Sequence, residues 1–349
     1  MYDVVIIGAG PAGSTLARQI AKTNKKILII DAENKKNKKP CGGLLAPDAQ
    51  KELAHYDLVI PKDVLVSPQI FSVKTIDLVS KQIKYYQRYY LNMDRYKFDK
   101  YLVSLIPKNV KKINGRVVKI EKHEEYVIEI LERNKKETVK SKIIIGADGC
   151  NSIVRRTFYK NNIMKYMAIQ EWYKCNDSSN SFYSCIFDKT TSDSCSWLIH
   201  KDEYLIYGGA FDIKNSKEKF LEQRNRLSKF LDIDLSKPVK KEACLVYRPK
   251  KFSDFITGKD GAYLIGEAAG FISASSFEGI SSAIKSASIL SEIINENNNI
   301  KKITKVYRVK TIKLKIKLRI KVIKRWFMYT SIVRNIIMKL GIDTIKINK

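Results

Sequence analysis

Three glycines in the segment GAGPAG are the first residues whose type and spacing indicate chemistry. They follow an apolar run that ends at Ile7 and precede a segment with helical spacing, as in proteins that bind dinucleotide phosphates at a helix N-terminus. Gly8 permits the tight turn, Gly10 lets the backbone approach a pyrophosphate, and Gly13 lets the helix pack closely on the strand. Asp31 ends the next apolar run, where a carboxylate can accept hydrogen bonds from ribose hydroxyls. The segment predicts a dinucleotide site without separating FAD from NAD.

Two later segments also join an apolar run to a glycine-containing turn. Residues 142–156, KIIIGADGCNSIVRR, bring Asp148 to the end of a predicted strand. Residues 262–287, AYLIGEAAGFISASSFEGISSAIKSA, bring Glu267 to the end of another strand and open a helix at Gly279. Each glycine taken singly fits an ordinary turn, but three motifs in this order argue against that interpretation.

In order and spacing, these motifs resemble those of the p-hydroxybenzoate hydroxylase-type flavoprotein superfamily, whose members carry GxGxxG, then GADGxxSxxR, then GDAAGxxxPxxGxG. The resemblance implies that the dinucleotide is FAD. It also implies that Asp148 lies near the FAD pyrophosphate and that Glu267, which stands where the family has Asp, holds the ribityl chain. The helix after Gly279 would point its N-terminus at the flavin pyrimidine edge, where negative charge gathers when the flavin is reduced.

Two further segments resemble the FAD-dependent geranylgeranyl reductase family within this superfamily. Residues 39–45, KPCGGLL, are similar to the family's KPCGGG loop, which lies against the isoalloxazine. Residues 93–102, MDRYKFDKYL, resemble its DRxxFDxxL helix start, which implies that Arg95 contacts the FAD phosphate and ribityl region. Taken alone, Arg95 fits a salt bridge at a helix N-terminus equally well. The overall resemblance is to the short bacterial and archaeal members, including the CbrA-like oxidoreductases.

The segment SWLIHKDEYLIYGGA is similar to the YxWxFPK…GxG signature in the substrate domain of the same family. It keeps Trp197, Lys201, Gly208 and Gly209, and it departs at Cys195, Ile199 and His200, where the family has Tyr, Phe and Pro. These departures leave the identity of the substrate open.

Four residues are candidates for catalysis: Cys41, Trp197, Tyr183 and Tyr207. Cys41 stands between Pro40 and two glycines in a basic loop, where a thiol could donate a proton or tune the flavin. A small residue kept for space is the alternative. Trp197 fits a packed core aromatic as well as a substrate platform. Tyr183 and Tyr207, in the predicted second sheet, are alternative proton donors.

The residues expected to contact the cofactor come from all of these motifs. They are Gly8, Gly10, Ala12, Gly13, Asp31, Ala32, Cys41, Gly42, Gly43, Arg95, Val118, Asp148, Gly149, Gly266, Glu267, Gly270, Gly279 and Ile280. No metal is expected, because histidine and cysteine show no cluster at zinc-ligand spacing.

The elements that must position these residues predict an α/β fold of the glutathione reductase type. Residues 2–30 show the order strand, helix, strand, and residues 34–45 form an irregular basic loop. Residues 70–91 and 167–247 alternate apolar and polar side chains, which predicts a separate antiparallel sheet. We therefore expect a Rossmann-like FAD-binding domain, an interleaved antiparallel β-sheet substrate domain and a helical C-terminus.

The expected domains are discontinuous, because the chain returns repeatedly to glycine-rich sequence. They are an FAD-binding domain over residues 1–65, 92–160 and 250–290, a substrate domain over residues 66–91 and 161–249, and a basic helical region over residues 291–349.

The C-terminal region contains neither Gly nor Pro between Gly279 and Gly341, which favours long helices. Between Ile312 and Val322 apolar and basic residues alternate as in a strand, but the apolar positions also form two helical faces, and the length without breakers favours a helix. Lysines interleaved with apolar residues suit contact with an anionic membrane. A helix that covers the sheet domain with its lysines in water is the alternative.

Size and composition restrict the class of protein. A chain of 349 residues suits two domains, and its net charge of +29 comes mostly from lysine, which we interpret as solvated surface rather than a nucleic-acid site. The N-terminus shows no signal-peptide pattern and no apolar run reaches spanning length, so a cytoplasmic protein is expected. The six cysteines, without a CxxC pair, are expected as reduced thiols.

Three functions are open at this point. The first is a reductase that transfers hydride from flavin N5 to a carbon–carbon double bond of an isoprenoid or other apolar substrate. The second is a flavin-dependent monooxygenase of an aromatic or polyketide substrate, and the third is a non-catalytic flavin- or lipid-sensing protein. Only one dinucleotide fingerprint is present, so the expected electron donor is transiently bound NAD(P)H or an acidic ferredoxin-like protein.

Overall fold

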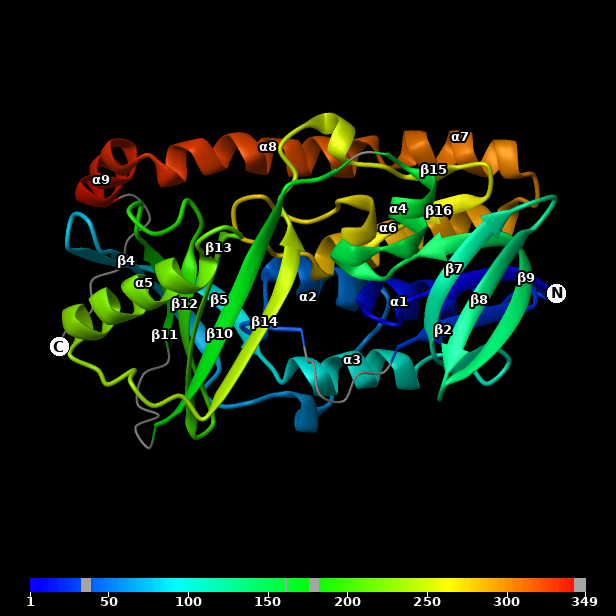
Figure 1. Ribbon diagram of the computed structural model, residues 1–349. Helices are drawn as coiled ribbons and strands as arrows, with labels where there is room; N and C mark the ends of the chain where they lie inside the picture. Colours follow the sequence, from blue (N-terminus) through cyan, green and yellow to red (C-terminus); the bar gives the residue numbers. More distant parts are fainter. Residues whose placement is uncertain (33–38, 161, 176–181, 342–349) are drawn as a thin grey trace. The chain divides into compact units, whose positions relative to one another are not determined.

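The computed structural model describes residues 1–32, 39–160, 162–175 and 182–341, and the chain forms two compact units (Figure 1). The first unit contains Met1–Lys36, Phe98–Met164 and Tyr247–Ile320. The second contains Asn37–Lys97, Lys165–Val246 and Lys321–Lys349. Each unit is built around its own sheet.

The sheet of the first unit is mainly parallel. β1 (Tyr2–Ile7) lies between β2 (Ile27–Asp31) and β9 (Lys135–Gly146), and both neighbours run parallel to it. β6 (Lys111–Asn114) extends the parallel order beside β2, and β16 (Ala262–Leu264) extends it beside β9. The antiparallel additions are β15 (Gly258–Lys259), β7 (Arg116–Lys122) and β8 (Tyr126–Glu132).

β1 is apolar along most of its length because both faces of its sheet are covered. Val4 and Ile6 point to one side and pack in a cluster with α1 (Pro11–Ile20) and α6 (Ile280–Glu296). Val5 and Ile7 point to the other side, into a second buried cluster. The alternation of a strand thus divides one apolar run between two layers of core. The strand, helix and strand predicted over residues 2–30 are confirmed.

The sheet of the second unit has the order β14, β10, β13, β12, β11, β4, β5, β3. Their bounds are β3 (Leu44–Leu45), β4 (Ile70–Asp77), β5 (Gln82–Asn92), β10 (Lys165–Lys174), β11 (Phe182–Phe187), β12 (Ser196–Lys201), β13 (Tyr204–Asp212) and β14 (Lys240–Tyr247). Most of its pairs are antiparallel, as predicted, but β4 and β11 are parallel. A long stretch of chain separates these two strands, so no hairpin forces them to run in opposite directions.

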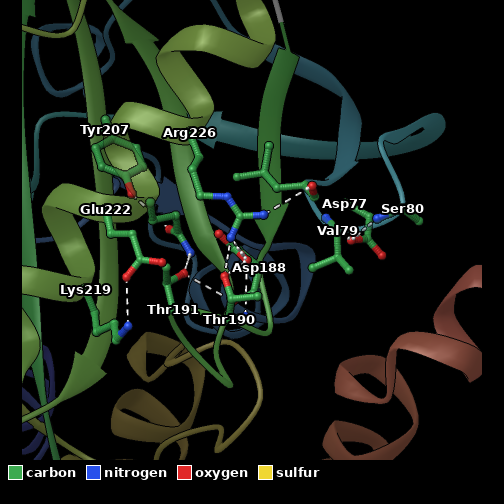
Figure 2. Close-up of polar contacts among 12 residues, drawn as sticks. Asp77, Val79, Ser80, Asp188, Thr190, Thr191, Tyr207, Lys219, Glu222 and Arg226 are labelled. Carbon is green, nitrogen blue, oxygen red and sulfur yellow. Dashed lines mark hydrogen bonds and ion pairs between the residues drawn. The ribbon is translucent and has the colours of Figure 1, made fainter.

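One face of the second sheet is covered by α5 (Ser216–Leu231), a helix that was not predicted within residues 167–247. Phe220 and Leu227 lie seven positions apart on one side of α5 and are buried in a cluster with sheet residues. Arg226 Nη1 of the same helix lies 2.9 Å from Oδ1 of Asp188, which follows β11 (Figure 2). The helix is therefore held by both apolar and ionic contacts.

The remaining elements include the helices of the C-terminal part. They are α2 (Pro47–His55), α3 (Arg95–Ser104), α4 (Ile153–Phe158), α7 (Ile300–Lys310), α8 (Ile312–Tyr329), α9 (Ser331–Leu340) and the short 3-10 helices η1 (Lys62–Val64), η2 (Gly149–Asn151), η3 (Phe252–Asp254) and η4 (Gly266–Ala269). The choice of helix over strand for residues 312–322 is confirmed. Among the helices that the structure describes, none is long and apolar enough to cross a membrane.

Candidate active site

The three glycine motifs meet at one edge of the first unit's sheet. β1, β9 and β16 run parallel, so their carboxyl ends lie at the same edge, and each strand ends in one motif. The Ala147 N–H donates to the carbonyl of Ile7 at 2.8 Å, and the Ile265 N–H donates to the carbonyl of Gly146 at 3.0 Å. Ligands of open α/β sheets bind beyond the carboxyl ends of the strands, so this edge is the expected place for a dinucleotide.

The glycines of GAGPAG have different physical roles. Gly8 has a φ of +101°, and a Cβ there would lie 2.6 Å from the carbonyl oxygen of Ala147. A Cβ on Gly13 would lie 1.9 Å from the carbonyl oxygen of Gly8, so α1 can approach the turn only with glycine at this position. A Cβ on Gly10 would meet no atom within 4 Å. Gly10 therefore leaves open space on the backbone, which fits the approach of a pyrophosphate.

Asp31 is joined directly to the glycine turn. Its Oδ1 accepts a hydrogen bond from the Ala9 N–H at 2.9 Å, which links the end of β2 to the end of β1. The carboxylate therefore lies beside the phosphate-binding turn, as expected for a residue that contacts the adenosine ribose.

Asp148 is half-buried at the start of η2. Its Oδ2 accepts a hydrogen bond from the Ile153 N–H at 2.7 Å, whereas its Oδ1 is buried and accepts no hydrogen bond from any residue that the structure describes. Burial raises the pKa of Asp148 above its ordinary value. A buried polar atom without a partner is costly, so Oδ1 fits a site completed by a bound polar group.

Glu267 lies next to the second motif. Its Oε1 accepts a hydrogen bond from the Tyr247 N–H at 2.9 Å, and its Oε2 lies 3.6 Å from where a Cβ of Gly149 would be. Gly266 faces the first motif, because a Cβ there would lie 3.0 Å from the Cβ of Ala12. Fold geometry thus brings together four predicted cofactor residues, Ala12, Gly149, Gly266 and Glu267, from three distant segments.

The other predicted contacts in the first unit differ in their setting. Ala32 follows β2 and is exposed, and Val118 is an exposed residue of β7 at a bulge. Gly270 follows η4, and a Cβ there would lie 2.7 Å from the Asp254 carbonyl oxygen, so packing requires this glycine. Gly279 and Ile280 begin α6, whose first turn has no acidic residue and no side-chain cap among the described residues. That helix start suits an anionic group.

Cys41 belongs to the second unit, where the KPCGG loop contacts Arg95. The Cys41 Sγ accepts hydrogen bonds from the Gly43 N–H at 3.4 Å and from Arg95 Nη1 at 3.6 Å. The segments KPCGG and DRYKFDKYL thus meet at this thiol. Residues 34–38 of the predicted loop lie outside the described residues.

The Lys201 side chain forms hydrogen bonds that hold the same loop. Its buried ammonium donates to the carbonyl oxygens of Met93 at 2.8 Å and Gly43 at 3.3 Å, and to Oδ1 of Asn92 at 2.5 Å. A Cβ on Gly43, which has a φ of +62°, would lie 2.6 Å from Lys201 Nζ. Burial lowers the pKa of Lys201 to about 7. In the sequence, Lys201 matched the YxWxFPK…GxG signature, but no role was predicted for it.

The Trp197 indole lies across neighbouring strands of the second sheet. Its Nε1 donates to Oε1 of buried Gln170 at 3.0 Å, and Gln170 Nε2 donates to Oε2 of Glu242 at 3.1 Å. A Cβ on Gly208 would lie 2.5 Å from the indole, so this glycine makes room for the ring. Neither Gln170 nor Glu242 was predicted, since neither stands in a recognisable motif. A Cβ on Gly42 would lie 3.6 Å from Trp197 Cδ1, so the KPCGG loop reaches the ring.

The two candidate tyrosines lie on opposite faces of this sheet. Tyr207 is paired with Leu198 and packs under α5, and its hydroxyl donates to Oε1 of Gln223 at 2.9 Å. Since successive residues alternate sides, Tyr207 faces away from Trp197. Tyr183 is on the face of Trp197, because Cys185, two residues further, pairs with Trp197. Burial raises the pKa of both hydroxyls well above the usual value.

Taken together, the first unit offers a dinucleotide cradle and the second offers a thiol held by cationic groups beside an aromatic ring. Carboxylates at positions 31, 148 and 267 offer hydrogen-bond acceptors, and the backbone at Gly10 offers open space, as an FAD site needs. Within the described ranges, no group of three His, Cys, Asp or Glu residues could hold a metal ion.

Comparison with known proteins agrees with this interpretation. Residues 2–162 match the family described as pyridine nucleotide-disulphide oxidoreductase. The chain is 41% identical to Protein CbrA of Escherichia coli O6:H1 (strain CFT073) over 98% of this chain and 94% of the relative. It is 42% identical to Protein CbrA of Shigella dysenteriae serotype 1 (strain Sd197) over 97% of each chain.

Solved structures are similar in fold. A geranylgeranyl bacteriochlorophyll reductase-like protein from Thermoplasma acidophilum has a TM-score of 0.79 at 19% identity, over 94% of this chain and 88% of that protein. A triple mutant of the flavin-dependent brominase Bmp2 has a TM-score of 0.71 at 20% identity, over 98% of this chain and 94% of that protein. The predicted α/β fold class is confirmed, and the family match together with these flavoprotein folds indicates that the cofactor is FAD.

Proposed function

The chain belongs to the CbrA family within the FAD-dependent oxidoreductases, and from this we propose that it reduces a carbon–carbon double bond of an isoprenoid or other apolar substrate. One observation carries the choice of a reductase. Gly42 and Gly43 of the KPCGG loop lie against Trp197, Ile199 and Lys201, which share one face of β12. Two segments that resemble the geranylgeranyl reductase branch are thus in contact with one another.

The proposal assigns binding roles to the first unit. Bound FAD supplies the hydride. The turn at Gly8, Gly10 and Gly13 receives the pyrophosphate, and Asp31 accepts hydrogen bonds from the ribose hydroxyls. Asp148 and Glu267 orient the polar chain of the cofactor. The α6 N-terminus stabilises negative charge by its oriented N–H groups.

The second unit supplies the proton in this proposal. Addition of hydride to one carbon of the double bond requires a proton on the other, and Cys41 Sγ–H is the proposed donor. The thiolate that remains is stabilised by the Arg95 hydrogen bond and by the nearby Lys201 ammonium. Tyr183 is the alternative donor on the same face, whereas Tyr207 is not carried forward. Trp197, oriented by Gln170, is the proposed platform for the apolar chain.

The electron donor in this proposal is NAD(P)H bound transiently or an acidic ferredoxin-like protein. The net charge of +29 supports steering of an acidic carrier.

The test is an anaerobic single turnover. The FAD-loaded protein is reduced with dithionite, freed of excess reductant and mixed with geranylgeraniol, while flavin absorbance and the mass of the product are followed. We expect reoxidation of the flavin and a product that has gained two hydrogen atoms. A substrate that is hydroxylated only when oxygen is admitted would replace the proposal by a monooxygenase. Bound FAD that geranylgeraniol never reoxidises would refute reduction of this substrate class.

The role of Cys41 is tested by Cys41→Ala with Cys244→Ala as the matched control, since neither cysteine forms a disulfide and both are partly exposed. We expect Cys41→Ala to slow product formation at least roughly a hundredfold, in the range of lost general acid catalysis. Flavin binding should be kept in both variants. Equal rates in the two variants would assign the proton to Tyr183 or to water.

A further inference from the structure

α8 carries an apolar stripe whose side chains are exposed. Its members follow one another at intervals of three or four residues on a single helix, so they lie on one face. They are Ile312, Ile316, Ile320, Ile323 and Phe327, with exposed fractions of 42%, 48%, 58%, 53% and 46%. We call these five residues the α8 stripe.

The α8 stripe does not hold the helix to the protein. The contact with the protein core is made by other positions, because Leu318 is buried and Leu314 packs against the same cluster of the first unit. The helix thus has one apolar face that is packed and another that is open. A helix that covers the sheet domain with its lysines in water was the alternative for this region, and it leaves the exposed isoleucines of the open face without a role. Contiguous exposed apolar side chains of this kind mark an interaction surface.

The charges around the stripe select the partner. Residues 300–341 contain no Asp or Glu. They contain many basic residues, namely Lys301, Lys302, Lys305, Arg308, Lys310, Lys313, Lys315, Lys317, Arg319, Lys321, Lys324, Arg325, Arg334 and Lys339. Lys315 and Arg334 are buried, and Arg325 and Arg334 form ion pairs with Asp193 and Asp77, so the remaining residues of this set carry the charge that a partner meets. A second copy of the chain carries the same positive charge and would be repelled. A partner must therefore be anionic and also accept a narrow row of isoleucine and phenylalanine side chains.

We propose that the α8 stripe docks on an anionic lipid membrane, with the helix lying in the plane of the interface. In this position the stripe enters the boundary between headgroups and acyl chains, and the flanking lysines and arginines remain at the phosphate level. Trp326, next to the stripe and mostly exposed, suits the same boundary. The proposal is independent of the reaction proposed above.

The test is flotation of the full-length, FAD-loaded protein with vesicles of phosphatidylcholine that contain phosphatidylglycerol, compared with vesicles of phosphatidylcholine alone. The variant Ile316→Glu with Ile320→Glu places two acids in the stripe. Its matched control, Ile213→Glu with Val239→Glu, makes the same change of charge at apolar residues that are also exposed. We expect the stripe variant to lower partition to anionic vesicles by at least about tenfold, and the control by less than about twofold.

Circular dichroism and the absorbance of bound FAD verify that both variants are folded, and geranylgeraniol reduction is measured separately, so that a failure of the proposed reaction is distinguishable. Equal partition of the wild type to anionic and neutral vesicles would overturn the proposal, as would equal losses in the stripe variant and the control. A dimer in size-exclusion chromatography with light scattering that the stripe variant dissociates would reassign the stripe to self-association. Capture of the wild type by anionic vesicles that weakens with added salt would support the proposal.

Discussion

At the scale of single residues, the glycines of the first motif serve two different purposes: one is needed for packing and another leaves room for a ligand. Gly13 is required by its neighbours, since a Cβ there would lie 1.9 Å from a backbone oxygen that cannot move aside. Gly10 is not required by any neighbour, because a Cβ would enter open space. Gly10 and Gly13 of one motif should therefore respond differently to the same substitution.

We predict that Gly13→Ala lowers the free energy of unfolding of the FAD-free protein by about 3 kcal/mol or prevents folding, because the added methyl overlaps the backbone. Gly10→Ala should leave the FAD-free protein within about 0.5 kcal/mol of the wild type and weaken FAD binding at least roughly tenfold. Urea unfolding of the FAD-free proteins and titration with FAD measure both effects. An unchanged FAD affinity in Gly10→Ala would contradict binding of the pyrophosphate at this position.

Lys201 makes stability depend on pH. Its pKa is lowered from 10.5 to about 7 in the folded protein, so between these values the folded state binds fewer protons than the unfolded chain. Stability therefore rises with pH through this window, by at most about 1.4 kcal/mol for each pH unit. Below pH 7 both states are protonated, so stability no longer changes with pH through this group and the cost of burying the charged ammonium is complete.

We predict that the difference in unfolding free energy between the wild type and Lys201→Met grows in favour of the wild type from pH 7 to pH 9. Lys217→Met, at an exposed position of α5, serves as the control. Urea titrations at several pH values provide the measurement. Parallel pH profiles of the wild type and Lys201→Met would show that the ammonium stays charged in the folded protein.

At the scale of elements, α5 is held on the second sheet by contacts of unequal value. The Asp188 carboxylate is fully buried and receives Arg226 together with the Thr190 hydroxyl at 2.7 Å, whereas Lys219 and Glu222 form a pair at the surface of the helix (Figure 2). A buried carboxylate that loses its cation keeps its desolvation cost. An ion pair at the surface contributes little to the free energy of unfolding, so its loss changes stability little.

We predict that Arg226→Met lowers the free energy of unfolding by about 1–3 kcal/mol, because Thr190 compensates only part of the lost ion pair. Lys219→Met should change it by less than about 0.5 kcal/mol. Thermal or urea unfolding of the two variants under one condition makes the comparison. Equal losses would mean that Asp188 gains water when Arg226 is removed.

At the scale of the whole molecule, the excess of lysine creates a positive field around the protein. A net charge of +29 speeds encounter with anionic partners at low ionic strength and does little once salt screens it. An acidic protein donor and NAD(P)H are both negatively charged, but a ferredoxin-like donor carries far more negative charge than NAD(P)H. Salt should therefore distinguish the two kinds of donor.

We predict that reduction of the bound FAD by an acidic ferredoxin slows at least roughly tenfold between about 0.02 M and 0.3 M NaCl, because steering is screened. Reduction by NADPH should slow much less. Stopped-flow absorbance of the flavin under anaerobic conditions measures both rates. A rate with ferredoxin that does not respond to salt would exclude electrostatic steering.

Much of the first unit could be predicted before its structure was known, because its signals are local. An apolar run, a glycine turn and an amphipathic helix within thirty residues define one supersecondary unit, and each glycine has a steric reason that operates over short distances. The order of the three motifs, through the resemblance to known flavoproteins, also predicted the FAD cofactor and the α/β fold. The choice of helix for α8 was local as well, since it depended on length and on the absence of Gly and Pro.

Long-range pairing settled the remaining questions, because period and spacing do not say which face meets which neighbour. The register of β12 against β13 turned Tyr207 towards α5 and away from Trp197, and it brought Lys201 beneath Gly43. Gln170 acquired its partner only when β10, β13 and β12 were paired side by side. Likewise α8 has two apolar faces in its sequence, and packing alone buried Leu318 and left the α8 stripe exposed.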